Sequence, residues 1–80
     1  MKINILAFGI VKEIFGVSIL DIELNDASTV HELKTMLEEK YPRLKQLASY
    51  MVAVNNEYAH TSQPITNKDE IAIIPPVSGG

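Results

Sequence analysis

The last six residues of this 80-residue chain lead to the group on which we expect its chemistry to depend, the C-terminal carboxylate. They are Pro-Pro-Val-Ser-Gly-Gly, and no charged side chain occurs from Ile71 onward, so the carboxylate of Gly80 is the charge expected there. Two prolines cannot continue a β-ladder and favour an extended course, whereas glycine lacks a side chain and has little conformational preference. We therefore expect a stiff base with a thin tip that can enter a narrow channel in another protein.

The carboxylate of Gly80 defines the chemistry that such a tip can undergo. A carboxylate is a poor acyl donor until it is activated. Attack on the α-phosphate of ATP would give an acyl-adenylate, from which a sulfur or nitrogen nucleophile could displace AMP; sulfur would leave a thiocarboxylate. The chain has no glycine-rich phosphate loop and no cysteine, so the catalytic groups for these steps are expected on partner proteins.

Composition excludes several other classes of function. Ten acidic against seven basic residues give a net charge of −3, which argues against nucleic acid as a partner. No apolar run approaches the ~18 residues of a membrane span. The lack of cysteine excludes a thiolate metal site and fits a reducing, cytoplasmic location. His31 and His60 are far apart, and no carboxylate cluster joins them, so no metal site is expected.

The length limits what the chain can build. Eighty residues support one domain with a thin core and little spare chain for a walled active site. A binding, carrier or subunit role is therefore favoured over a self-contained enzyme.

The pattern of apolar residues predicts the elements that carry the tail. Strands are expected at residues 2–8, 17–24, 50–54, 57–59 and 70–74, and a single helical turn or compact loop at residues 10–15. The main helix should begin after Thr29, which forms a capping box with Glu32, and should end near Lys40, ahead of Pro42. Residues 43–49 fit either a loop or a short helix.

These elements follow the order β-β-α-β-β-β, which predicts an α+β fold. The first two strands should pair antiparallel, and the first and last should pair parallel through a right-handed crossover that contains the helix. The result is a β-grasp fold, a mixed sheet of four to five strands with one main helix packed on one face. We expect a β-grasp domain over residues 1–74 and a flexible Gly-Gly tail over residues 75–80.

A sheet with a single helix leaves its other face or an edge available to a partner, and apolar residues there would mark the contact. The candidates are Phe8, Tyr58 and Ile74. Phe8 fits a core position equally well if Leu6 faces the helix, unless the strand bends near Gly9. Tyr58 follows an expected hairpin turn at Asn55-Asn56 and should lie at the surface.

Several segments together resemble one known family. Residues 8–16 (FGIVKEIFG) resemble its aromatic-x-x-V-[RK]-E-hydrophobic-x-G segment, and similar matches occur at residues 29–33 and 52–55. The most specific match is PITNKDEI at residues 64–71, followed by the PPVSGG ending. The chain resembles the small, sulfur-carrier subunits of molybdopterin synthase, a ubiquitin-like β-grasp family. It departs from them at Asn67-Lys68-Asp69, where the family often has D-G-D, and at Ile73-Ile74, where an aromatic residue is common.

The resemblance implies a carrier that is not itself a catalyst. An ATP-dependent adenylyltransferase, similar to ubiquitin-activating enzymes, would adenylate Gly80, and a sulfur-relay donor would convert it to a thiocarboxylate. The carrier would then bind the large synthase subunit in a heterotetramer and help turn cyclic pyranopterin monophosphate into the molybdopterin dithiolene. No cofactor is expected on this chain, since ATP is used by the activating partner. The tail residues that would thread the partner's active site are Pro75, Pro76, Val77, Ser78 and Gly79.

Other functions share this chemistry or this tail. A sulfur carrier for thiamine thiazole synthesis or tRNA thiolation would use the same thiocarboxylate, and a tungsten-pterin pathway would use the same dithiolene. A ubiquitin-like modifier would instead be joined through Gly80 to lysines of target proteins. An interaction module would leave the tail inert. Residues 8–16 and the paired prolines favour the pterin pathway.

Overall fold

The computed structural model describes residues 1–47 and 49–76, so Ala48 and the last four residues, 77–80, lie outside the described part. The elements follow the predicted order, and the two segments that the sequence assigned to either a loop or a short helix, 10–15 and 43–49, both contain helical residues. In chain order they are β1 (Lys2–Ala7), α1 (Gly9–Phe15), β2 (Ile19–Glu23), α2 (Val30–Lys40), α3 (Pro42–Lys45), β3 (Met51–Val54), β4 (Glu57–Tyr58) and β5 (Ile71–Ile74).

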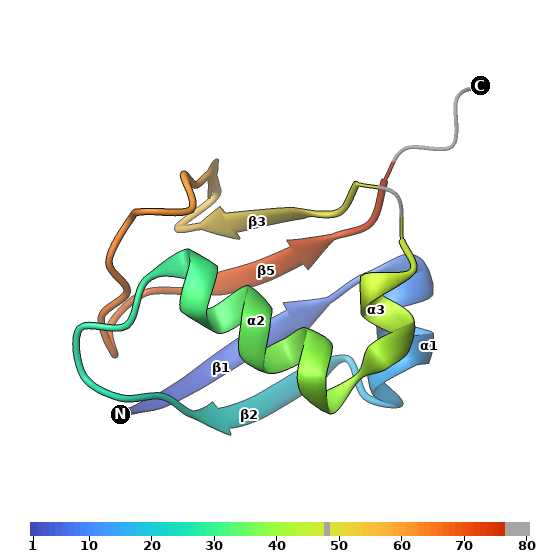
Figure 1. Ribbon diagram of the computed structural model, residues 1–80, viewed down its shortest axis with the longest axis horizontal. Helices are drawn as coiled ribbons and strands as arrows, with labels where there is room; N and C mark the ends of the chain where they lie inside the picture. The colour runs from blue at the N-terminus through green and yellow to red at the C-terminus, as the bar shows by residue number, and fades with distance from the viewer. Residues whose placement is uncertain (48, 77–80) are drawn as a thin grey trace.

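The strands form one mixed sheet in the order β2-β1-β5-β3-β4. The parallel pair is β1 and β5, with Ile5 opposite Ile71 and Ala7 opposite Ile73. The pairs β1–β2, β3–β4 and β3–β5 are antiparallel. The predicted pairing of the first strand with the second and with the last is confirmed. Helix α2 crosses one face of the sheet, and α1 and α3 lie at the end toward which β1 and β5 run (Figure 1).

The core lies between α2 and the sheet. Ile3 and Ile5 of β1 and Ile71 and Ile73 of β5 are buried, because alternate residues of a strand point to the same face. Helix α2 covers them with residues at helical spacing, which are Val30, Leu33 and Leu37. Within residues 1–47 and 49–76, no helix covers the second face of the sheet.

Local sequence signals fix the limits of α2. The Thr29 N–H donates to Glu32 Oε1 at 2.9 Å, and the Glu32 N–H donates to Thr29 Oγ1 at 3.3 Å, so the predicted capping box is confirmed. The helix ends at Lys40, also as predicted. Pro42 then occupies the first turn of α3, where its missing N–H would have no partner in any case. Of the two alternatives for residues 43–49, the structure has a short helix at the start, with Leu44 buried.

All five predicted strands are longer than the observed ones, by one to three residues. Strand β1 ends at Ala7 because Gly9, with φ of +55°, turns the chain into α1. Helix α1 ends at Phe15 and is capped by Gly16, whose φ of +78° is left-handed, a conformation that glycine adopts readily. The Phe15 ring packs on Tyr41 with ring centroids 4.8 Å apart, and this contact anchors α1.

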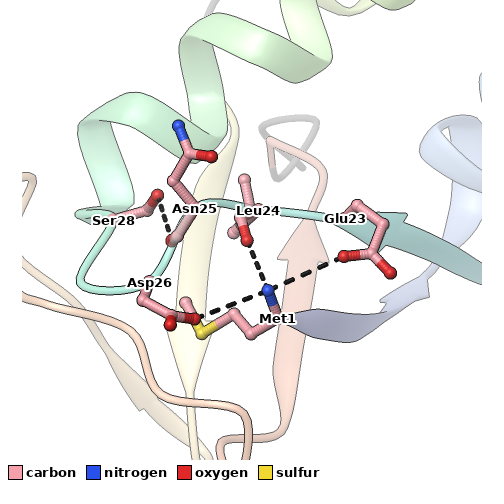
Figure 2. Close-up of polar contacts among 6 residues, drawn as sticks. All are labelled: Met1, Glu23, Leu24, Asn25, Asp26 and Ser28. Atoms are coloured by element: carbon pink, nitrogen blue, oxygen red, sulfur yellow. Dashed lines mark hydrogen bonds and ion pairs between the residues drawn. The ribbon is translucent and has the colours of Figure 1, made fainter.

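At the other end of the sheet, the start of β1 is tied to the loop after β2 (Figure 2). The Met1 ammonium donates to the Leu24 carbonyl oxygen at 2.6 Å, and carboxylate oxygens of Glu23 and Asp26 each lie 3.6 Å from it. Both carboxylates are exposed, so these ion pairs contribute little to stability. Ser28 Oγ donates to the Asn25 carbonyl oxygen at 2.7 Å and shapes the same loop.

Candidate docking face and tail base

An apolar row crosses all five strands on the face of the sheet that α2 does not cover. Leu6 is paired with Ile19 on one side and with Ala72 on the other, while Ala53 is paired with Ala72 and with Tyr58. Paired residues on neighbouring strands point to the same face, so these five share one face. We call it the open face.

The two alanines leave a hollow at the centre of the open face. It has a volume of about 290 Å³ and is lined by Leu6, Phe8, Ala53, Asn56, Tyr58, Glu70, Ala72 and Ile74. That volume is at the lower limit of small-molecule sites, which span roughly 300–1,000 Å³. The hollow is therefore better suited to one or two side chains of a protein partner.

The hollow contains all three residues that the sequence singled out for a partner. Phe8 is 47% exposed and Tyr58 is 67% exposed, while Ile74 is half-buried. For Phe8 the structure selects the surface alternative: Leu6 lies on the open face, and Phe8, two residues later, follows it. That these residues contact a partner remains a prediction.

Sequence reasoning missed other members of the open face. Ile19 is 54% exposed and Met51 is 43% exposed; Ile19 is paired with Leu6, and Met51 with Ile74. Strand pairing is the signal that assigns both to this face, and a single sequence does not supply it.

A polar clamp holds the hairpin on which Tyr58 lies. Asn55 and Asn56 turn the chain with φ of 53° and 69°, the left-handed values of a tight hairpin. The Asn55 side chain donates to Asp69 Oδ1 and accepts from the Glu70 N–H, both at 2.9 Å. Asp69 Oδ2 accepts from the Thr66 N–H at 2.8 Å. The Thr66 N–H first, and then the Asn55 amide, lower the pKa of Asp69 below its ordinary value.

The base of the tail begins beside the open face. Strand β5 ends at Ile74, and Pro75 and Pro76 are half-buried. The predicted threading residues Val77, Ser78 and Gly79, together with Gly80, lie outside the described residues, so their roles remain predictions.

A second polar cluster lies on the helix-covered side of the sheet. Tyr50 is buried and donates its hydroxyl to Glu38 on α2, while Lys34 Nζ lies 4.9 Å from the centre of the Tyr50 ring. Burial, followed by the hydrogen bond to Glu38, raises the pKa of Tyr50 well above its ordinary value. These contacts tie β3 to α2, and we assign them to stability.

The described residues, 1–47 and 49–76, include no group of three or more His, Cys, Asp or Glu side chains that could hold a metal ion. Both histidines are exposed. Within the same part of the chain, no helix has the length and apolar character needed to cross a membrane.

The sheet order and the single main helix place the chain among the ubiquitin-like β-grasp proteins. SAMP1 from Haloferax volcanii has this fold, with a TM-score of 0.84 and 24% identity over the whole of both chains. The chain belongs to the ThiS family, whose model matches residues 5–80.

Two further comparisons concern molybdopterin synthesis. The molybdopterin synthase sulfur carrier subunit of Dictyostelium discoideum is 43% identical over 99% of this chain and 96% of its own length. A chain from the Helicobacter pylori complex of subunits 1 and 2 of molybdopterin-converting factor is 28% identical over the whole of both chains, with a TM-score of 0.69.

Proposed function

We propose that this chain is the sulfur carrier of a molybdopterin synthase and that Gly80 carries the sulfur as a thiocarboxylate. The observation that carries the proposal is the position of the tail base: Pro75 directly follows Ile74, which lines the hollow of the open face. A partner docked on that hollow would have the start of the tail within its reach. The similarity over nearly the full length to the carrier subunit of D. discoideum supports the same function.

Charging of the tail would take two steps on an activating enzyme. First, a carboxylate oxygen of Gly80 attacks the α-phosphorus of ATP, the bond from that phosphorus to the bridging oxygen breaks, and pyrophosphate leaves. Then hydrosulfide, or a sulfur-relay donor that delivers its equivalent, adds to the acyl carbon; the bond to AMP breaks and a proton is released to solvent. ATP would bind the activating enzyme, and this chain would supply only the acyl group.

Discharge would take place on the large subunit. The thiocarboxylate sulfur would bond to a side-chain carbon of cyclic pyranopterin monophosphate as an oxygen substituent leaves that carbon. Water would then cleave the acyl carbon–sulfur bond, which leaves the sulfur on the pterin and returns Gly80 as a carboxylate, and two such transfers would complete the dithiolene of molybdopterin. The H. pylori complex, in which a similar chain is bound to a second subunit, supports a large-subunit partner. We infer that two carriers and two large subunits assemble as a heterotetramer in the cytoplasm.

The open face has the composition of a protein–protein contact. Phe8 and Tyr58 are exposed aromatic residues, and aromatic anchors that fill pockets contribute most of the energy of many interfaces. Asn56 and Glu70 add polar groups to the wall of the hollow, in the way that interface cores are bordered by a polar rim.

Incubation of the carrier with its activating enzyme, ATP and sulfide tests the proposal. Mass spectrometry should show a gain equal to the mass difference between sulfur and oxygen. Oxidation of any of the three methionines gives the same nominal gain, so a thiol-alkylating reagent should follow. Because the chain has no cysteine, an added alkyl group reports the thiocarboxylate alone.

Deletion of Gly80 provides the control. The truncated chain should form no thiocarboxylate and should support no sulfuration of the pterin by the large subunit. Sulfuration by the truncated chain would refute the proposal. Capture of a thiazole synthase would instead indicate the thiamine pathway, and isopeptide adducts on lysines would indicate a protein modifier.

A further inference from the structure

The base of the tail rests against a glycine in the turn between β1 and α1. A Cβ atom placed on Gly9 would lie 3.3 Å from Cγ of Pro75, which is tighter than ordinary van der Waals contact. The parallel register explains the contact: Ala7 is opposite Ile73, and two residues further along each strand come Gly9 and Pro75. The missing side chain of Gly9 therefore leaves room for the proline ring.

The turn that contains Gly9 is held in place by a backbone hydrogen bond and by buried side chains of α1. Gly9 has φ of +55°, which glycine adopts without strain. The Val11 N–H donates to the Phe8 carbonyl oxygen at 3.0 Å across the turn. The side chains of Val11 and Phe15 are buried, and together they hold α1 against the core. Pro75 thus rests on a supported surface.

The same turn adjoins the open face. Phe8 lines the hollow directly before Gly9, and Ile74 lines it directly before Pro75. A partner that contacts Phe8 and Ile74 therefore contacts the neighbours of both members of the Gly9–Pro75 pair. Docking and the direction of the tail base are linked through adjacent residues.

We propose that Gly9 is a positioning residue for the reaction of the tail. By seating Pro75, it fixes the direction in which the chain leaves β5, so that the base of the tail is already oriented when the carrier docks. This inference rests on the proposed function, because the reaction it concerns is the charging of Gly80. Preorganisation of this kind reduces the ordering that remains when the reacting group is brought into place.

The test compares two glycine-to-alanine variants in the charging reaction. Gly9→Ala introduces the close contact with Pro75 and also the strain of an alanine at positive φ. Gly16→Ala introduces the strain alone, since Gly16 has φ of +78° and nothing lies within 4 Å of its Cβ position. With the activating enzyme, ATP and sulfide, Gly9→Ala should lower kcat by about tenfold and change the KM for the carrier by less than about twofold. Gly16→Ala should match the wild type.

A double-mutant cycle attributes the effect to Pro75. Pro75→Ala removes the ring atom that the new Cβ would meet. In that background Gly9→Ala should lower kcat no further than Gly16→Ala does, because the two positions are coupled only through the ring. An undiminished Gly9→Ala effect in the Pro75→Ala background would overturn the inference.

Two further outcomes separate this inference from the proposed function. If the wild type forms thiocarboxylate and Gly9→Ala has the same kcat as Gly16→Ala, the inference is wrong and the proposed function stands. If the wild type forms no thiocarboxylate, the proposed function is wrong and the inference falls with it. A nuclear Overhauser effect between the Gly9 α-protons and the Pro75 γ-protons should be observed in the free carrier, and its absence would overturn the seating of Pro75.

Discussion

Asn55 holds Asp69 through a 2.9 Å hydrogen bond from its side-chain amide to the carboxylate, and so connects the β3–β4 turn to the loop before β5. The same Asn55 side chain accepts the Glu70 N–H. Both segments border the hollow, through Asn56 and Glu70 respectively. The shape of the open face at this edge therefore depends on one exposed polar clamp.

The clamp should make stability depend on pH in the acid range. The pKa of Asp69 is lower in the folded chain than its ordinary value of 3.8, so the folded state favours the ionised carboxylate. Its contribution is present above the unfolded-state pKa and is lost as pH falls through the folded-state pKa. Urea unfolding between about pH 5 and about pH 2 should show this loss, and Asp69→Asn should reduce the slope.

Removal of the whole Asp69 side chain should cost more. Asp69→Ala loses the bonds from both Thr66 and Asn55 and should lower the free energy of unfolding by about 1–2 kcal/mol near neutral pH. Asp21→Ala, at an exposed position of β2, serves as the control and should have a smaller effect. If both variants lowered the free energy of unfolding equally, the hydrogen bonds of Asp69 would make no specific contribution to stability.

Tyr50 should make stability depend on pH in the alkaline range. Burial raises the pKa of Tyr50 well above its ordinary value of 10.0, so the folded state favours the protonated phenol. The free energy of unfolding is unaffected by Tyr50 below the unfolded-state pKa and falls as pH rises above about 10, because there the Tyr50 phenol ionises only in the unfolded chain. Spectrophotometric titration and unfolding curves of the wild type should show this loss. If the free energy of unfolding fell equally with alkaline pH in the wild type and in Tyr50→Phe, the raised pKa of Tyr50 would be contradicted.

The two phenylalanines of the chain should separate docking from folding. Phe8 is 47% exposed and Phe15 is 7% exposed. Phe8→Ala should weaken binding to the large subunit by at least about tenfold and lower the free energy of unfolding by about 1 kcal/mol or less. Phe15→Ala should lower that free energy by about 3–5 kcal/mol. Calorimetric binding and urea unfolding measure the two effects, and unchanged binding by a folded Phe8→Ala variant would exclude this face.

Filling the hollow should block the partner without damage to the fold. Ala72 lies at the centre of the apolar row and is half-buried, so Ala72→Leu would place a larger side chain in the hollow. Binding to the large subunit should fall at least about tenfold, while the free energy of unfolding changes by less than about 1 kcal/mol. Thr35→Leu, on the exposed side of α2, adds a similar apolar surface elsewhere and should leave binding unchanged. Equal binding by both variants would show that the hollow is not occupied in the complex.

Local signals determined much of this protein from its sequence. Thr29 and Glu32 lie three residues apart and can cap a helix without any distant contact, so the start of α2 was predictable. The turn at Asn55-Asn56 and the cap at Gly16 after α1 were also predictable, because few residue types adopt the left-handed conformation readily. The two prolines and two glycines at the end of the chain likewise indicated a tail whose chemistry lies in its carboxylate.

The tertiary structure decided which side chains share a face. Alternation along β1 places Leu6 and Phe8 together, but a shift of one residue in the pairing would move both to the helix side. The observed pairing of the five strands settles that choice. It also brings Ile19, Ala53 and Tyr58 into one row with Leu6. It also sets Gly9 against Pro75, 66 positions away, a contact that requires β1 and β5 to be parallel neighbours. The expected chemistry of the tail thus follows from the last residues of the sequence, whereas the position of its base at Pro75 and the proposed docking face depend on strand register.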